Sequence, residues 1–395
     1  MLAVVFGGDH VAEHMIARMS GILRAELSRS ALRHNVAEIR RVVGPDCEIC
    51  AVVKANAYGH GLDVLVPCLA PWVDRFAVTL PPTALAVREA GWEGPILTFF
   101  RAAGFARAGE SQERVEELAQ AGVTVTVSGE EDVDLLERVG RRLGRPVEAH
   151  LKIDTGMTRS GVLGPNAPAL AETLRRSAGV HLTGVYTQIA SADSLDLSSA
   201  DAQLEVFDGV LDALGETENL TVHAANSAAT IALPAARRNM VRPGLAIYGC
   251  YPSPEMERSL DLRPVLRLTA QLLEVKRVAA GCRTGYGLTH TFDRDSRIGT
   301  VSVGYADGYP RALSDRATMR VRGFDVPICG AISMDQVVVD LTDLEEARIG
   351  DEVEVISIDP ASPHSLERLA SLAGTIPYEI SCGLGLRVER VVVEE

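Results

Sequence analysis

The feature that most constrains the fold is a regular alternation of short apolar runs and helical segments, which begins near residue 30. The apolar runs are rich in Val, Ile, Leu, Thr and Phe, and their composition favours β-strands. Eight strand candidates follow one another along the chain, at 48–53, 75–79, 95–99, 123–127, 147–153, 180–186, 220–224 and 239–243.

The segments between these runs have the Ala, Leu, Glu and Arg periodicity of helices. Three of them, 82–91, 111–122 and 129–144, end in a glycine that is typical of a helix stop. Because strand–helix alternation gives parallel pairing, eight strands within about 210 residues predict a closed (β/α)8 barrel of the TIM type. An open doubly wound sheet is the alternative, but no GxGxxG motif follows the first strand.

The pattern changes near residue 260. Short strand-like segments broken by Gly, Pro and Asp fill 261–395, and one clear helix is expected at 362–374. These signals predict a mainly-β second domain. We therefore expect an N-terminal extension over 1–23, a barrel over 24–260 and a C-terminal β-domain over 261–395.

Charge and cysteine content narrow the class of protein. The 395 residues include 39 basic and 53 acidic side chains, a formal net charge of −14, whereas nucleic-acid and anionic-membrane surfaces need clustered Lys and Arg. We expect neither partner. Seven scattered cysteines and a start without a basic, apolar signal region indicate a reducing, cytoplasmic location. The stretch 10–14 matches an HxxEH zinc pattern by its letters only, because no third ligand stands nearby, so no metal site is predicted.

Polar residues stand at the ends of several predicted strands. In a barrel of this type the chemistry lies at the carboxyl ends of the strands, so these residues are the site candidates. A lysine directly after an apolar strand is costly unless it is used or paired, and a buried lysine has a lowered pKa and forms Schiff bases readily. In chain order the candidates are Lys54, Lys152, Asp154, Arg159, Tyr186, Gln188, His223, Ser227, Arg242 and Gly244.

Two of these candidates point to a phosphate. Ser227 and Gly244 follow strands seven and eight, where barrels commonly bind phosphate through backbone N–H groups and a small hydroxyl. A Schiff-base lysine across the same barrel mouth is the arrangement that a pyridoxal 5'-phosphate (PLP) enzyme needs. The residues themselves therefore indicate PLP as the cofactor.

Seven distinctive segments follow one another along the chain: AVVKANAYGHG (51–61), LKIDTGMTRSG (151–161), HAANSAAT (223–230), RPGLAIYG (242–249), GYADGYPR (304–311), SMDQ (333–336) and IPYEISC (376–382). In order and in register, they resemble the successive motifs of the alanine racemase family. The resemblance covers the chain from about Arg24 to its C-terminus. It implies a PLP-binding barrel followed by a β-domain, a homodimer with shared active sites, and a small amino-acid substrate. The implied reaction interconverts L- and D-alanine and supplies D-alanine for peptidoglycan.

The resemblance assigns roles to individual residues. Lys54 matches the lysine that binds the cofactor covalently and acts as one proton-transfer base, and Tyr286 matches the opposite base, which comes from the other subunit. Arg242 resembles the arginine that faces the pyridine nitrogen. Because a guanidinium does not readily give up its proton, the ring nitrogen stays largely unprotonated and the cofactor is a weaker electron sink. Arg159 resembles the arginine beside the phenolic oxygen and the substrate carboxylate. Lys152 matches a lysine that is carbamylated in many members, for which a chloride ion is the alternative.

The remaining assignments concern the phosphate and the substrate. Met334 matches a residue that the partner subunit brings to the substrate, and Tyr305 matches a narrow entrance that limits the substrate side chain to about a methyl or hydroxymethyl group. The positions that match phosphate contacts are Tyr58, Ser227, Gly244, Leu245 and Tyr378.

One residue departs from the family pattern. Members usually have histidine after strand six, where this chain has Gln188. Glutamine forms hydrogen bonds but cannot stack as an aromatic ring or carry a proton, so we expect altered tuning of Tyr286 in a functional enzyme. A broad-specificity or serine racemase, and a degraded PLP-binding protein, stay open as alternatives.

Overall fold

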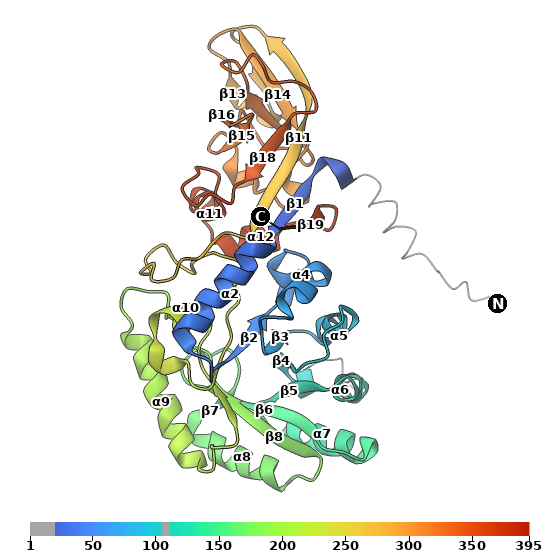
Figure 1. Cartoon of the computed structure of the whole chain (residues 1–395), viewed down its shortest axis with the longest axis vertical. Coiled ribbons are helices and arrows are strands. Elements are labelled where there is room, and N and C mark those ends of the chain that lie inside the picture. Colours follow the sequence, from blue (N-terminus) through green and yellow to red (C-terminus); the bar gives the residue numbers. More distant parts are fainter. Residues whose placement is uncertain (1–19, 105–110, 395) are drawn as a thin grey trace, which may run out of the picture. The chain divides into compact units, whose positions relative to one another are not determined.

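The computed structural model describes residues 20–104 and 111–394, and the HxxEH stretch at 10–14 lies outside these ranges. The chain divides into two compact units (Figure 1). The barrel unit comprises Ala31–Leu262, and the β unit combines the described residues before Ala31 with those from Arg263 onward.

Eight parallel strands form the barrel unit, as the sequence predicts. Their order in the sheet is β10-β2-β3-β4-β5-β6-β8-β9, and a short strand, β7 (Val162–Leu163), pairs with β6. Asn239 links the two end strands, because its backbone N–H donates to Val222 O at 3.3 Å and its Oδ1 accepts from Val222 N–H at 2.7 Å. The (β/α)8 prediction is confirmed. The strands are β2 (Glu48–Val52), β3 (Arg75–Val78), β4 (Ile96–Arg101), β5 (Val123–Val127), β6 (Val147–Asp154), β8 (Val180–Tyr186), β9 (Thr221–His223) and β10 (Met240–Val241).

Helices cover the outside of this sheet (Figure 1). The glycines that the sequence marks as stops end three of them: Gly91, Gly122 and Gly144 follow their helices with φ of +90°, +66° and +68°, a conformation that is unfavourable for residues with a Cβ. The helices of the unit are α2 (Arg29–Val43), α4 (Leu62–Leu69), α5 (Pro81–Glu89), α6 (Ser111–Gln120), α7 (Glu130–Leu143), α8 (Ala167–Arg176), α9 (Ser198–Leu214) and α10 (Ser227–Ala232), besides the short turn α3 (Lys54–Tyr58).

The first strand of the described residues, β1 (Arg24–Ser28), belongs to the β unit. It pairs antiparallel with β11 (Leu266–Val278) and parallel with β19 (Glu389–Val393). The expected boundary at residue 24 assigned β1 to the barrel, whereas these backbone pairings join it to the C-terminal sheet.

The rest of the β unit is built around β11. One part of β11 pairs with β1 and with β18 (Glu352–Ile356), and the other part pairs with β14 (Ser296–Val301). Two short helices, α11 (Leu366–Ala373) and α12 (Pro377–Cys382), also occur, where the sequence predicted one. The remaining strands are β12 (Arg283–Thr284), β13 (His290–Thr291), β15 (Thr318–Val321), β16 (Phe324–Pro327) and β17 (Val337–Asp340).

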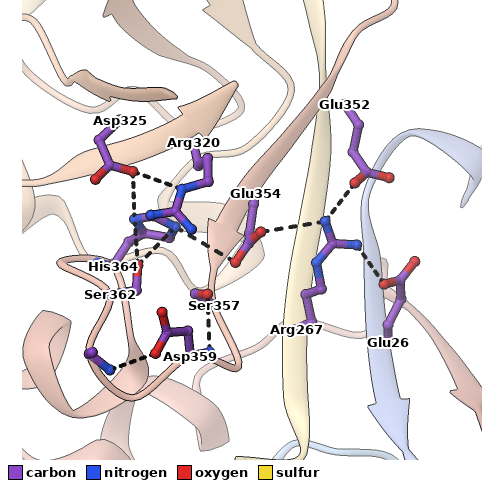
Figure 2. A network of polar contacts seen from close by, with 11 residues as sticks. Glu26, Arg267, Arg320, Asp325, Glu352, Glu354, Ser357, Asp359, Ser362 and His364 are labelled. Atoms are coloured by element: carbon purple, nitrogen blue, oxygen red, sulfur yellow. Dashed lines mark hydrogen bonds and ion pairs between the residues drawn. The ribbon is translucent and has the colours of Figure 1, made fainter. Parts of the chain in front are cut away.

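A polar network connects the strands of the β unit (Figure 2). Arg267 on β11 donates to Glu26 on β1 at 2.9 Å and to Glu352 on β18 at 2.7 Å, and it lies 3.5 Å from Glu354. The fully buried His364 approaches Glu354 to 3.7 Å. Burial acts to raise the pKa of Glu354, but hydrogen bonds from His364 and Ser357 and the charge of Arg267 outweigh it and lower the pKa to about 2. The network therefore holds a carboxylate ionised inside the sheet.

No helix in the described ranges is both long enough and apolar enough to cross a membrane.

Candidate active site

Side chains from the carboxyl ends of several barrel strands surround one cavity of about 450 Å³. Five of the sequence candidates line it, namely Lys54, Lys152, Arg159, Tyr186 and Gln188. The charged walls are mostly basic, which suits an anionic ligand. The complete lining is Lys54, Thr79, Phe99, Phe100, Arg101, Gly104, Lys152, Arg159, Ser160, Tyr186 and Gln188.

Lys54 begins a left-handed turn. The four residues after it, Ala55, Asn56, Ala57 and Tyr58, all have φ between +51° and +55°. A left-handed conformation costs an L-residue roughly 1–2 kcal/mol, so this turn stores strain directly beside the cavity. The two ends of the turn differ in burial. Lys54 is exposed at the cavity, whereas burial was expected for a lysine after an apolar strand, and Tyr58 is buried.

Tyr58 meets the loop after β10. A Cβ on Gly244 would overlap the Tyr58 hydroxyl, so only glycine allows this approach of the two chains. The Ser227 Oγ accepts hydrogen bonds from Gly244 N–H at 2.8 Å and Ala246 N–H at 3.3 Å. Its own proton can therefore be donated to a phosphate oxygen. Leu245 is buried in the same loop. The structure thus brings together all of the barrel residues that match phosphate contacts.

Arg242 lies buried in the barrel and is 2% exposed. Its guanidinium contacts His223 Nδ1 at 2.7 Å and donates to Thr187 O at 2.8 Å and to Gln188 Oε1 at 3.2 Å. These acceptors are neutral, and no ion pair between Arg242 and a carboxylate is found within 20–104 and 111–394. Burial lowers the pKa of Arg242 to about 10, which leaves it protonated at neutral pH.

Lys152 is 5% exposed, and its Nζ donates to Ser160 Oγ at 2.6 Å. Burial, together with the charges of Arg159 and Arg242, lowers the pKa of Lys152 to about 8. Arg159 itself is exposed at the cavity. The two neighbouring cations that the sequence led us to expect are therefore present, and their repulsion contributes to the lowered pKa of Lys152.

Four of the sequence candidates lie in the β unit, namely Tyr286, Tyr305, Met334 and Tyr378. Tyr286, Tyr305 and Met334 are 74%, 43% and 53% exposed. Two of their loops are joined, because Tyr305 N–H donates to Ser333 O at 3.1 Å and Ala306 N–H donates to Met334 O at 3.0 Å.

Ion pairs hold these joined loops in place. Arg387 contacts Asp307 at 2.5 Å and Asp335, the residue after Met334, at 2.6 Å. Both carboxylates raise the pKa of Arg387. Tyr378 lies on α12 in the same unit.

Sequence reasoning missed the part of the cavity that follows β3 and β4. Thr79 lies directly after β3, and Phe99, Phe100 and Arg101 lie at the end of β4. Arg101 is held by the fully buried Asp132, whose Oδ1 lies 3.2 Å from Arg101 Nε. The available signal was a basic residue, Arg101, two positions after the apolar run at 95–99. No cluster of three His, Cys, Asp or Glu side chains suited to a metal occurs in the part of the chain that the structure describes.

Comparisons with known proteins give a consistent result across both units. Residues 27–252 match the family model "Alanine racemase, N-terminal domain", and residues 265–392 match "Alanine racemase, C-terminal domain". The alanine racemase of Methanococcus maripaludis is 35% identical over 372 residues, which cover 93% of this chain and 97% of that protein.

Two solved structures are similar over nearly the whole chain. The alanine racemase of Clostridium difficile 630 has a TM-score of 0.87 at 31% identity and covers 94% of this chain and 96% of its own. An alanine racemase from Bartonella henselae with covalently bound pyridoxal phosphate has a TM-score of 0.82 at 30% identity and covers 94% and 100%.

Proposed function

Because this chain belongs to the alanine racemase family, we propose that it interconverts L- and D-alanine with PLP as cofactor. The observation that carries the proposal is the basic cavity at the barrel mouth, which is lined by Lys54 and by Gln188, the side chain to which the buried Arg242 donates. In the cell, we propose that the D-alanine supplies peptidoglycan synthesis in the cytoplasm.

The residues present fit PLP. An aldehyde needs an accessible amine, which Lys54 offers, and a phosphate needs hydroxyl and backbone donors without an intruding side chain. Tyr58, Ser227 and Leu245 surround Gly244, where a Cβ would overlap the Tyr58 hydroxyl. When bound, PLP supplies an electron sink that makes the Cα proton of an amino acid removable.

The protein's own residues would move that proton. Lys54 would remove or return it on one face of Cα, and Tyr286 would do the reverse on the other face. Inversion requires two bases because a single base would return the proton to the face from which it came. Arg242 would hold the ring nitrogen by donating a hydrogen bond. Because Arg242 keeps its proton, the ring nitrogen would stay unprotonated, and the cofactor would hold negative charge only briefly.

We also propose that CO2 modifies Lys152. An amine with a pKa of about 8 has an appreciable neutral fraction at neutral pH, whereas an ordinary lysine has almost none. The neutral amine forms an N–C bond to CO2 and releases one proton to solvent. The resulting anion would pair with Arg159 and fix it toward the substrate carboxylate.

The second base requires a second copy of the chain. Tyr286, Tyr305 and Met334 are large side chains exposed in the β unit, and we propose that they enter the barrel mouth of a partner in a homodimer. Tyr378 would complete the phosphate site. A test mixes two inactive variants, Lys54→Ala and Tyr286→Phe, because a shared site predicts one intact site per mixed dimer and hence recovered activity. Absence of recovery, when dimers exchange, would contradict the sharing.

The reaction is tested by deuterium incorporation at Cα in D2O with L-alanine, D-alanine and L-serine. Both alanine enantiomers should gain deuterium and interconvert, and serine should react more slowly if Tyr305 and Met334 limit the side chain. The cofactor link is tested by borohydride reduction. The chain has three lysines, Lys54, Lys152 and Lys276, so peptide mapping assigns the adduct without ambiguity. An adduct elsewhere than on Lys54 would overturn the proposed site.

A further inference from the structure

A chain of two buried histidines lies behind Arg242, and proton transfer at Cα does not use either of them. His150 comes from β6 and His223 from the end of β9, and both are fully buried. His150 Nδ1 lies 2.9 Å from His223 Nε2, and His223 Nδ1 lies 2.7 Å from Arg242 NH1. The three side chains therefore form one hydrogen-bonded line inside the barrel.

The direction of every hydrogen bond in this line follows from its first member. A guanidinium can only donate, so His223 Nδ1 must accept and carries no proton. Burial lowers the pKa of His223 well below its ordinary value, so the ring is neutral and its single proton is on Nε2. That N–H donates to His150 Nδ1, and His150, whose pKa burial lowers to about 3, must then carry its own proton on Nε2.

The line ends at His150. Its Nε2 is buried, and no hydrogen-bond partner for it is found in the described part of the chain. The ring lies against the backbone of Gly184 on β8, where an added Cβ would be 2.5 Å from this nitrogen. A buried N–H without an acceptor lowers the stability of the folded state, so the unpaired Nε2–H of His150 is a destabilising feature of the barrel.

Stacking fixes the orientation of the His223 ring, in addition to its two hydrogen bonds. Tyr186 stacks on it with ring centroids 4.6 Å apart and an angle of 6° between the planes. The Tyr186 hydroxyl lies 2.8 Å from Thr126 Oγ1, so the stacking partner is itself held. Arg242 already determines which His223 nitrogen is bare, and within the described residues His150 is the acceptor recorded for the protonated one.

We propose that His150 is a positioning residue: by accepting from His223 Nε2–H, it holds the His223 ring where Nδ1 accepts from Arg242, so that the guanidinium stays aimed at the cofactor. The inference rests on the proposed function. Without an acceptor at His150, the buried Nε2–H of His223 is left unpaired, and the ring can reach another acceptor only by drawing Nδ1 away from Arg242. The guanidinium would then lose the acceptor that fixes its position.

Three variants test this role. His150→Leu removes the acceptor, and His150→Asn restores one, because its Oδ1 can take the place of Nδ1. Val125→Ala on β5 is the matched control, because Val125 is also fully buried and is paired with Ala149. Ala149 precedes His150 on β6, and successive side chains of a strand alternate between the two faces of the sheet, so Val125 and His150 lie on opposite faces. The dissociation constant for PLP should rise about 10- to 100-fold in the Leu variant, the effect of one buried donor left without an acceptor. The Asn variant should recover most of the affinity, and Val125→Ala should leave it unchanged.

The direct measurement is the tautomeric state. In holoenzyme labelled with ¹⁵N-histidine, long-range proton–nitrogen spectra should show His223 and His150 protonated on Nε2 alone, with His150→Leu assigning the signals. A proton on His223 Nδ1 in the unmodified protein would overturn the proposal, even if the Leu variant failed to fold. Equal PLP affinity in the Leu variant and the Val125→Ala control would also overturn it. If the enzyme did not racemise alanine, the tautomers and PLP affinities would still be measurable, so failure of the proposed function is distinguishable.

Discussion

Replacing Lys152 by methionine should stabilise the barrel unit in the absence of CO2. Methionine keeps the apolar stem of the side chain but removes a buried cation. A drop in the pKa of Lys152 from 10.5 to about 8 means that the charged form costs the folded state about 3 kcal/mol. The hydrogen bond to Ser160 offsets about 1 kcal/mol of this cost, so Lys152→Met should gain about 2 kcal/mol at pH 7.

The pH dependence of this gain has a definite sign. Between pH 8 and 10.5 the unfolded state binds more protons at Lys152 than the folded state, so the native protein becomes more stable as pH rises. The advantage of Lys152→Met is therefore complete below pH 8 and disappears by about pH 10.5. Bicarbonate should reduce or reverse the advantage at pH 7, because carbamylation converts the strained cation into an anion beside Arg159.

Urea unfolding followed by tryptophan fluorescence measures the effect. Both tryptophans, Trp72 and Trp92, lie in the barrel unit, so their signal reports on that unit. Lys276→Met is the control, since Lys276 is an exposed lysine on β11 that pairs with Glu274 at 3.3 Å. Equal stability of Lys152→Met and the unmodified protein in CO2-free buffer would refute the argument that the Lys152 charge is strained. An equal response of both proteins to bicarbonate would refute carbamylation.

Three further outcomes are expected. Gln188→His should change kcat and its pH profile, because the amide that now accepts from Arg242 would be replaced by a ring that can carry a proton. Steady-state kinetics that match those of the unmodified enzyme at every pH would count against this prediction. Glu354→Gln should remove about 3 kcal/mol of unfolding free energy that is present above pH 4.5 and lost as pH falls toward 2, so the variant and the unmodified protein should converge in acid unfolding curves. Ala55→Gly should raise the unfolding free energy by about 0.5–1 kcal/mol, because relief of left-handed strain exceeds the added entropy of the unfolded chain; a lower unfolding midpoint in urea would contradict it.

The barrel could be predicted from the sequence because its strands are buried on both faces and therefore appear as apolar runs. The positions of these runs also predicted that Lys54, Lys152 and Arg242 lie at the carboxyl ends of barrel strands. The pairing of β1 with β11 could not be predicted, since nothing local in residues 24–28 identifies a partner more than two hundred residues away.

Two features of the site were also hidden from the sequence. Ala55, Asn56 and Ala57 carry no local preference strong enough to announce a left-handed turn, so surrounding contacts must impose it. The alignment of His150 with His223 depends on how β6, β8 and β9 lie side by side, and a histidine inside an apolar strand has no pattern that reveals its neighbour.

The position of β1 has a consequence for biosynthesis. As the chain leaves the ribosome, β1 emerges first, yet one of its partners, β11, begins at residue 266 and the other, β19, at residue 389. The barrel unit, 31–262, is contiguous and can fold while β1 is still an unpaired strand. The sheet that contains β1 is completed only after β19 has been synthesised, so a chain halted before residue 389 would have a formed barrel and a β1 strand with an open edge.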